Sequence, residues 1–174
     1  MNIYPIALFL HLVGALGISV ALGLEWTSLR QIRNAISPEQ VRAWMGILKS
    51  TNKVGFISMF TTVITGVYML LKVWGWVAWI LVTIGALVLM IAISRVVTVP
   101  RLKALGQAQG TVLDPLLWVS ILTRVAIVLG IIFLKIAKPD LGGSLLTIGV
   151  AIIIGVATTL PVARREHAQE WSAE

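Results

Sequence analysis

Residues 3–26 read IYPIALFLHLVGALGISVALGLEW and form the first long apolar run of the chain. It is apolar along nearly its whole length, and about 20 such residues form a helix that crosses the hydrocarbon core of a bilayer. Steps of four residues share one helix face, and here they give a column of mostly small residues: Ala7, His11, Ala15, Ser19 and Gly23. Such a face lets another helix approach closely in a membrane, and the ionisable His11 within it marks a functional-site hypothesis.

The composition extends this conclusion to the whole chain. Hydrophobic residues make up 58% and charged residues 12% of the 174 residues, whereas soluble domains carry about 25% charged residues. A β-barrel would require short segments of alternating polarity, but the apolar runs here are continuous. We therefore expect an all-α membrane protein in which residues 1–163 form a single transmembrane bundle and residues 164–174 form a polar cytoplasmic tail.

Five apolar runs are long enough to predict transmembrane helices. They are residues 4–24, 54–71, 77–99, 116–136 and 144–162. Between the third and fourth runs, Asp114 followed by Pro115 predicts a capped helix start. Residues 138–143, with the sequence KPDLGG, predict a tight turn before the fifth run.

The connection between the first two runs predicts an additional short helix over about residues 38–50. Ser37 is a natural N-cap, Pro38 suits the first helical position, and Gln40 completes a capping box. An apolar stripe then recurs at helical spacing: Val41, Trp44, Met45 and Leu48. We interpret the segment as an amphipathic helix on the cytoplasmic membrane surface; the alternative is a continuation of the second spanning helix into solvent.

Lysine and arginine are distributed unevenly between the two sides of this arrangement. Nine of the 14 fall in the first connection, the third connection and the tail, whereas three, Lys72, Lys135 and Lys138, lie at the opposite side. Because cytoplasmic loops carry the excess, we expect the N-terminus outside and the C-terminus inside. The same charges make anionic lipids of the cytoplasmic leaflet the expected partners, rather than nucleic acid.

His11 lies roughly 10 Å from the outer surface by helical rise, at about the level of Tyr68, Met69 and Thr65 on the second run. An imidazole with a methionine sulfur could ligate haem iron, haem b being the cofactor that fits. An imidazole with Tyr68 and Thr65 could equally form an interhelical hydrogen bond. The other histidine, His167, lies in the tail on the opposite side, so a haem held by two histidines of one chain is excluded.

A second candidate cluster lies in the inner half of the bundle. Arg124 falls roughly 13 Å inside the fourth run, where a lone cation costs at least about 2.5–3.5 kcal/mol, so a partner is expected. Glu25, at the inner end of the first run, is the acidic residue near enough, with Arg95 as a second basic member. No carboxylate lies near a helix centre and the chain has no cysteine, so we expect no catalytic group and no metal beyond a haem iron at His11.

The fifth run carries its own column of small residues, namely Thr147, Ala151, Gly155 and Thr159. It could pack within the bundle, on a second copy of the chain or on a partner membrane subunit.

The segment FLHLVGA, residues 9–15, resembles the first helix of a group of small bacterial membrane proteins. The group includes copper-resistance protein D-like proteins, membrane protoporphyrinogen oxidases of the J type and integral membrane proteins of unknown function, which share Leu-His-x-x-Gly/Ala. The resemblance implies a bacterial cytoplasmic membrane location and a haem ligand at His11. The oxidases continue with an aromatic-rich segment that contains Pro-Arg and ends in histidine, whereas residues 24–30 here read LEWTSLR, so oxidase activity is not implied.

Two functions follow as hypotheses. In the first, the protein is an accessory subunit or scaffold without catalysis of its own, present as a homo-oligomer or with a partner membrane subunit. In the second, it is a haem-binding or redox membrane protein in which His11 is the axial ligand.

Overall fold

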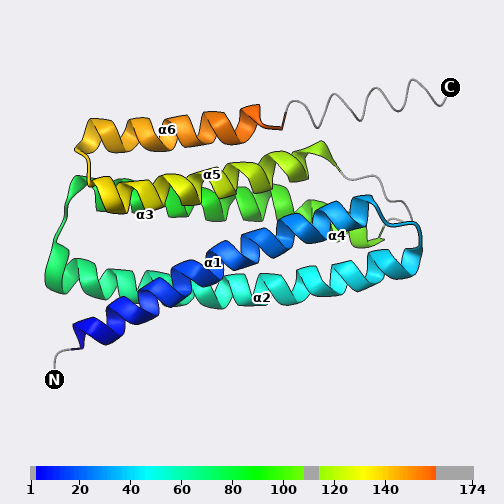
Figure 1. The fold of residues 1–174 in the computed structure, drawn as a ribbon, viewed down its shortest axis with the longest axis horizontal. Coiled ribbons are helices and arrows are strands. Elements are labelled where there is room, and N and C mark those ends of the chain that lie inside the picture. Colours follow the sequence, from blue (N-terminus) through cyan, green and yellow to red (C-terminus); the bar gives the residue numbers. More distant parts are fainter. Residues whose placement is uncertain (1–2, 108–113, 160–174) are drawn as a thin grey trace. The chain divides into compact units, whose positions relative to one another are not determined.

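The computed structural model describes residues 3–107 and 114–159, and every regular element among them is helical (Figure 1). The elements are α1 (Tyr4–Arg33), α2 (Pro38–Met69), the π-helical turn η1 (Leu70–Trp74), α3 (Ala78–Ile93), the π-helical turn η2 (Ser94–Thr98), α4 (Val99–Gln107), α5 (Pro115–Ala137) and α6 (Leu141–Ala157). The predicted all-α class is confirmed for this part of the chain. The predicted tail, residues 164–174, lies outside the described residues.

Four helical stretches in the described residues are long and apolar enough to cross a membrane. They are Tyr4–Arg33, Pro38–Trp74, Ala78–Leu105 and Pro115–Ala137. The fifth predicted run forms α6, a shorter apolar helix of 17 residues. The expectation of a polytopic helical membrane protein is therefore supported by length and composition, with four helices that reach the full spanning length.

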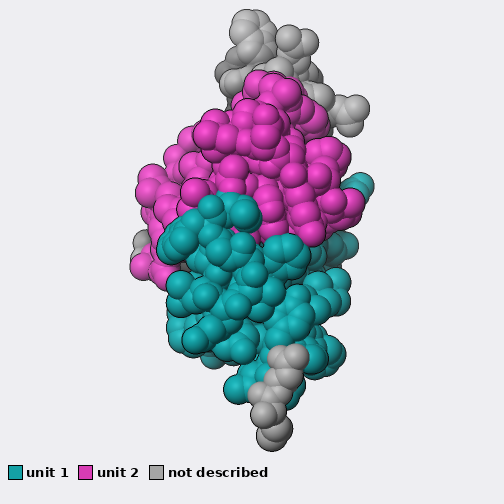
Figure 2. Space-filling view, turned by 90° about the vertical axis from the view of Figure 1, so that its left-hand side faces the viewer, with its two compact units in different colours: residues 1–77 teal, residues 78–174 magenta. Residues whose placement is uncertain are grey.

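The chain divides into two compact units, residues 1–77 and residues 78–174 (Figure 2). The first unit is an antiparallel hairpin in which α1 runs alongside α2. In the second unit α3, α5 and α6 pack on one another around an apolar cluster. The buried members of this cluster are Ala86, Ile127, Ile131, Leu134 and Ile148.

The face that α1 buries follows alternating steps of three and four residues. Its members include Gly14, Ile18, Ala21, Glu25, Ser28 and Ile32. A step of four residues turns the helix by about 400° and so drifts by about 40°, whereas alternating steps stay on one side, as in a coiled coil. The predicted column of four-residue steps therefore leaves the buried face of α1 gradually: Ala15 is half-buried, Ser19 and Gly23 are exposed, and a Cβ on Gly23 would have no neighbour within 4 Å.

Small residues bring α1 and α2 into close contact along this seam. A Cβ built on Gly14 would lie 2.8 Å from the backbone carbonyl oxygen of Ser58, and one on Gly17 would overlap the Ser58 side chain. One turn further, a Cβ on Gly55 would lie 3.3 Å from the Cβ of Ala21. Because no larger side chain fits at these positions, the glycines set the distance between the two helices.

The predicted start of α2 is confirmed. The side-chain oxygen of Ser37 accepts a hydrogen bond from the Gln40 N–H at 3.3 Å, and the Gln40 side-chain oxygen accepts one from the Ile36 N–H at 3.0 Å. Pro38 occupies the first turn, where a missing N–H is tolerated. The capping chemistry is local, so it can be recognised without tertiary information.

Residues 38–50 do not form a helix of their own but are the first part of α2, which continues without a break to Met69. No proline or glycine lies between Leu48 and Val54 to end the helix. The apolar stripe lies on the buried side of α2, since Leu48 is only 1% exposed and Trp44 is half-buried. The alternative interpretation, in which residues 38–50 continue the second helix, is therefore the one observed: α2 is a long helix that extends past its apolar part.

The third apolar run also extends further than predicted, because Pro100 does not end it. The π-helical turn η2 precedes this proline, with the Val99 N–H bonded to the carbonyl of Ser94, five residues earlier. A proline ring clashes with the carbonyl four residues before it in a regular helix, and the widened turn changes this spacing. The helical path continues as α4 to Gln107.

The connection between α5 and α6 is shorter than predicted. Lys138 ends α5 in the left-handed conformation with φ 47°, and Asp140 caps α6 by accepting a hydrogen bond from the Gly143 N–H at 2.8 Å. Helix α6 therefore begins at Leu141 and includes the two glycines that were expected in the turn. The carboxylate cap overrides the weak helix propensity of glycine at these positions.

Candidate functional site

The imidazole of His11 is joined to the backbone of α2. Its Nδ1 lies 2.9 Å from the carbonyl oxygen of Thr62, and since a carbonyl can only accept, Nδ1 is the donor. The hydroxyl of Thr65 lies 3.3 Å from the same nitrogen and itself donates to the carbonyl of Thr61 at 2.7 Å. The structure therefore brings His11 together with Thr65, as one of the two interpretations of the sequence expects, and adds a backbone carbonyl, that of Thr62, as a partner.

Gly66 makes this contact sterically accessible. A helical side chain covers the turn that precedes it, so a side chain at position 66 would cover the Thr62 carbonyl. A Cβ there would lie 3.1 Å from Cε1 and 3.4 Å from Nδ1 of His11. The imidazole thus occupies the space that the missing side chain leaves, and the ring packs directly on α2.

The other two residues of the predicted haem set lie on the next turn of α2. Met69 is buried on the same face as Thr62 and Thr65, four residues beyond Thr65, and Tyr68 is half-buried beside it. Because the His11 ring already contacts α2 at Gly66, the porphyrin ring of a haem does not fit between α1 and α2 at this level. A haem bound to His11 would therefore have to stand outside the helix pair.

The tautomer of His11 nevertheless suits metal binding. When Nδ1–H of a neutral imidazole donates to a carbonyl, Nε2 carries the lone pair, and this is the usual arrangement of metal-ligating histidines. Within residues 3–107 and 114–159, no group of three or more His, Cys, Asp or Glu side chains could hold a metal ion.

The predicted charge cluster is divided between the two units, with Glu25 in the first and Arg95 and Arg124 in the second. Glu25 lies in α1 and is 4% exposed, whereas Arg124 lies in α5 and is 6% exposed. Arg95 lies in η2 and is exposed. Both Glu25 and Arg124 are thus buried as expected for partnered charges, and their pairing with each other stays a prediction.

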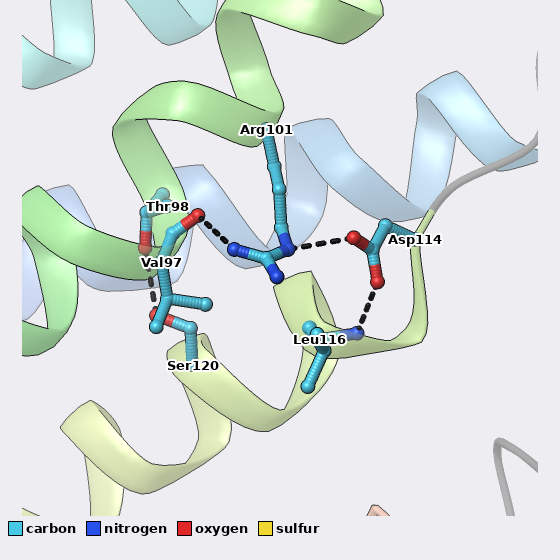
Figure 3. A network of polar contacts seen from close by, with 6 residues as sticks. All are labelled: Val97, Thr98, Arg101, Asp114, Leu116 and Ser120. Carbon is cyan, nitrogen blue, oxygen red and sulfur yellow. Dashed lines mark hydrogen bonds and ion pairs between the residues drawn. The ribbon is translucent and has the colours of Figure 1, made fainter.

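A polar network that sequence reasoning missed holds the start of α5 against α4 (Figure 3). The Nε of Arg101 donates to a carboxylate oxygen of Asp114 at 2.6 Å, while the second oxygen of Asp114 accepts the Leu116 N–H at 2.8 Å. The predicted cap by Asp114 is therefore confirmed, but its ion pair was not foreseen. Arg101 and Asp114 are 13 residues apart and belong to different helices, Arg101 to α4 and Asp114 to the cap of α5, so no helical spacing connects them.

A second hydrogen bond of the same network is buried. The hydroxyls of Thr98 on η2 and Ser120 on α5 lie 2.7 Å apart (Figure 3). The carbonyl of Ser120 in turn lies 3.4 Å from the Nε of Arg124, which donates to it. The widened turn η2 and the N-terminal half of α5 are thereby fixed to each other.

The small-residue column of α6 faces α5. A Cβ on Gly155 would lie 2.6 Å from the Cα of Thr123, and the Cβ of Ala151 would lie 3.2 Å from one built on Gly130. Both Ala151 and Gly155 are buried. The column therefore packs on a helix of the same chain, which is the first of the three packing partners considered for it.

Models of protein families, curated proteins and solved structures were compared with the chain, and none matches.

Proposed function

We propose that this protein is a polytopic integral membrane protein that acts as a scaffold or accessory subunit without catalysis of its own. The observation that carries this proposal is the contact of His11 with the Thr62 carbonyl at 2.9 Å. The imidazole of His11, the side chain most expected to have a chemical function, instead joins two helices. It packs on Gly66 of α2 and lies one turn from Gly14, where the two helices are in close contact. Such interhelical hydrogen bonds between closely packed helices are a common means of assembling membrane bundles.

The proposed arrangement has five spans, with α6 as the fifth, in a bacterial cytoplasmic membrane with the N-terminus outside. The apolar side chains exposed on α1 and on the second half of α2 suit lipid contact. The basic residues of the first connection lie at the inner end of this hairpin, where α1 and α2 extend past their apolar parts. In this arrangement residues 38–53 stand on the cytoplasmic side as the membrane-proximal part of α2.

Cysteine labelling tests the orientation, since the natural chain has no cysteine. A cysteine replacing Asp140 is expected to react with an impermeant maleimide from the outside of intact cells, and one replacing Ala104 only after permeabilisation. The reverse pattern contradicts the proposed orientation.

A partner or a second copy of the chain is the expected companion of a scaffold. Ser19 and Gly23 remain exposed on α1 and present a small-residue face, which is the kind of surface that membrane helices use for association. Purification in mild detergent should yield a stable oligomer or co-purify a membrane partner. A strict monomer with no partner contradicts the scaffold function.

Haem binding is the second candidate, and one observation favours it. The Nδ1–H of His11 donates to a carbonyl, and in a neutral imidazole this places the lone pair on Nε2, the nitrogen through which most histidines ligate iron. Protein expressed with excess haem should then show a Soret band that is lost in His11→Ala. Colourless protein under those conditions removes this candidate and leaves the scaffold function.

A further inference from the structure

One exposed face of α2 changes abruptly from basic to apolar. The basic side chains Lys49 and Lys53 lie one turn apart, and Ile57 follows at the next turn. Ile57 is 64% and Phe60 is 60% exposed. In a helix proposed to cross a membrane, such a change marks the level at which the helix enters the bilayer.

A shallow hollow lies at this level on the exposed surface. It is lined by Asn52, Lys53, Phe56 and Ile57, almost wholly through their apolar atoms. The neighbouring Gly55 faces Ala21 of α1, so these four residues flank the seam and are directed away from it. All four are exposed, with Phe56 at 63%.

We propose that this hollow holds an acyl chain of one anionic phospholipid against Phe56 and Ile57, with the phosphate at the edge of the hollow beside Lys53 and Asn52. The inference rests on the proposed membrane-spanning function and names a specific lipid contact for it. The ammonium group of Lys53 attracts the phosphate, the amide of Asn52 donates a hydrogen bond to it, and the two apolar side chains cover the hydrocarbon. Lys49, one turn away, adds positive charge on the headgroup side.

The test uses the full chain with Ile57→Cys, labelled with a bimane fluorophore and reconstituted in nanodiscs. Brominated phosphatidylglycerol or brominated phosphatidylcholine with the same acyl chains quenches the probe when it occupies the hollow. Phosphatidylglycerol should quench at about five-fold lower mole fraction, since one basic residue near an anionic headgroup contributes about that preference. Adding Lys53→Gln should abolish the preference, and adding Lys53→Arg should retain it.

Arg42→Gln is the matched control, because it removes the same charge from the same helix about 16 Å away by helical rise. It should leave the preference unchanged. Equal quenching by the two lipids, or an equal loss in Arg42→Gln and Lys53→Gln, overturns the lipid site. A probe that neither lipid quenches shows that protein covers this face and also overturns it.

Failure of the proposed function gives a different result. A chain that stays out of the membrane fraction and cannot be reconstituted contradicts the membrane-spanning function itself. A chain that reconstitutes normally but shows no lipid preference contradicts only the lipid site. Native mass spectrometry of the unlabelled chain with each lipid gives a second measurement, in which Lys53→Gln should lower retention of phosphatidylglycerol to the level of phosphatidylcholine.

Discussion

His11 on α1 and Thr62 on α2 are 51 residues apart in the chain and are joined by a 2.9 Å hydrogen bond from the imidazole Nδ1 to the backbone carbonyl. The acceptor belongs to the backbone, so it is present whatever side chain stands at position 62. The contact therefore depends on the donor at position 11 and on the absence of a side chain at Gly66. These two positions, rather than Thr62 itself, are where substitutions should act.

Replacing His11 by alanine should lower the free energy of unfolding by about 1 kcal/mol, because one interhelical hydrogen bond in a membrane protein contributes about 0.6–1.7 kcal/mol. His11→Gln should lose less, since its amide can still donate to the carbonyl. Unfolding of the reconstituted protein in mixed micelles, followed by circular dichroism, measures both. Equal stability of His11→Ala and the unsubstituted protein would show that the bond contributes nothing.

Gly14→Ala should destabilise the hairpin by about 1–3 kcal/mol, the usual range for overpacking. The added Cβ would lie 2.8 Å from the Ser58 carbonyl oxygen, and a backbone atom cannot rotate away. Gly23→Ala is the matched control on the same helix, where a Cβ meets nothing within 4 Å, and it should be neutral or slightly stabilising. The same unfolding titration distinguishes them, and a Gly14→Ala protein as stable as Gly23→Ala contradicts the observed seam.

Asp114→Ala should destabilise more than Arg101→Gln. Asp114 both caps α5 and pairs with Arg101, and loss of a cap costs about 0.5–2 kcal/mol. The ion pair alone should contribute less than about 1 kcal/mol, because the two side chains are 29% and 41% exposed. Asp114→Asn, which can still cap, should resemble Arg101→Gln. If Arg101→Gln proves the more damaging change in thermal unfolding, the cap is not the main role of this carboxylate.

The sequence-based pairing of Glu25 with Arg124 predicts a reciprocal charge effect. Glu25→Arg and Arg124→Glu should each reduce the amount of folded protein in the membrane, because each leaves like charges buried. The double variant should recover most of it. Quantitative immunoblotting of membrane fractions measures the effect, and a double variant no better than either single one means that the two residues are not a pair.

The fold class and the helix starts follow from short stretches of sequence. Hydropathy identifies the apolar helices because each carries its own signal over about 20 residues. Ser37 and Asp114 predict the starts of α2 and α5 because a cap satisfies N–H groups two or three residues away. The interpretation of residues 38–50 as a separate helix was wrong and its alternative was right, since the polar residues between Leu48 and Val54 look like a boundary although none of them ends a helix.

The sequence by itself thus determined that the chain is helical, largely apolar and capped at Ser37 and Asp114. Only the tertiary structure decided which face of α1 is buried, that Gly66 leaves room for the His11 ring, and that Arg101 meets Asp114. The physical reason is the range of the interactions. Hydropathy and capping act within one segment, whereas a helix face becomes a contact only when a second helix, distant in the chain, supplies the matching surface.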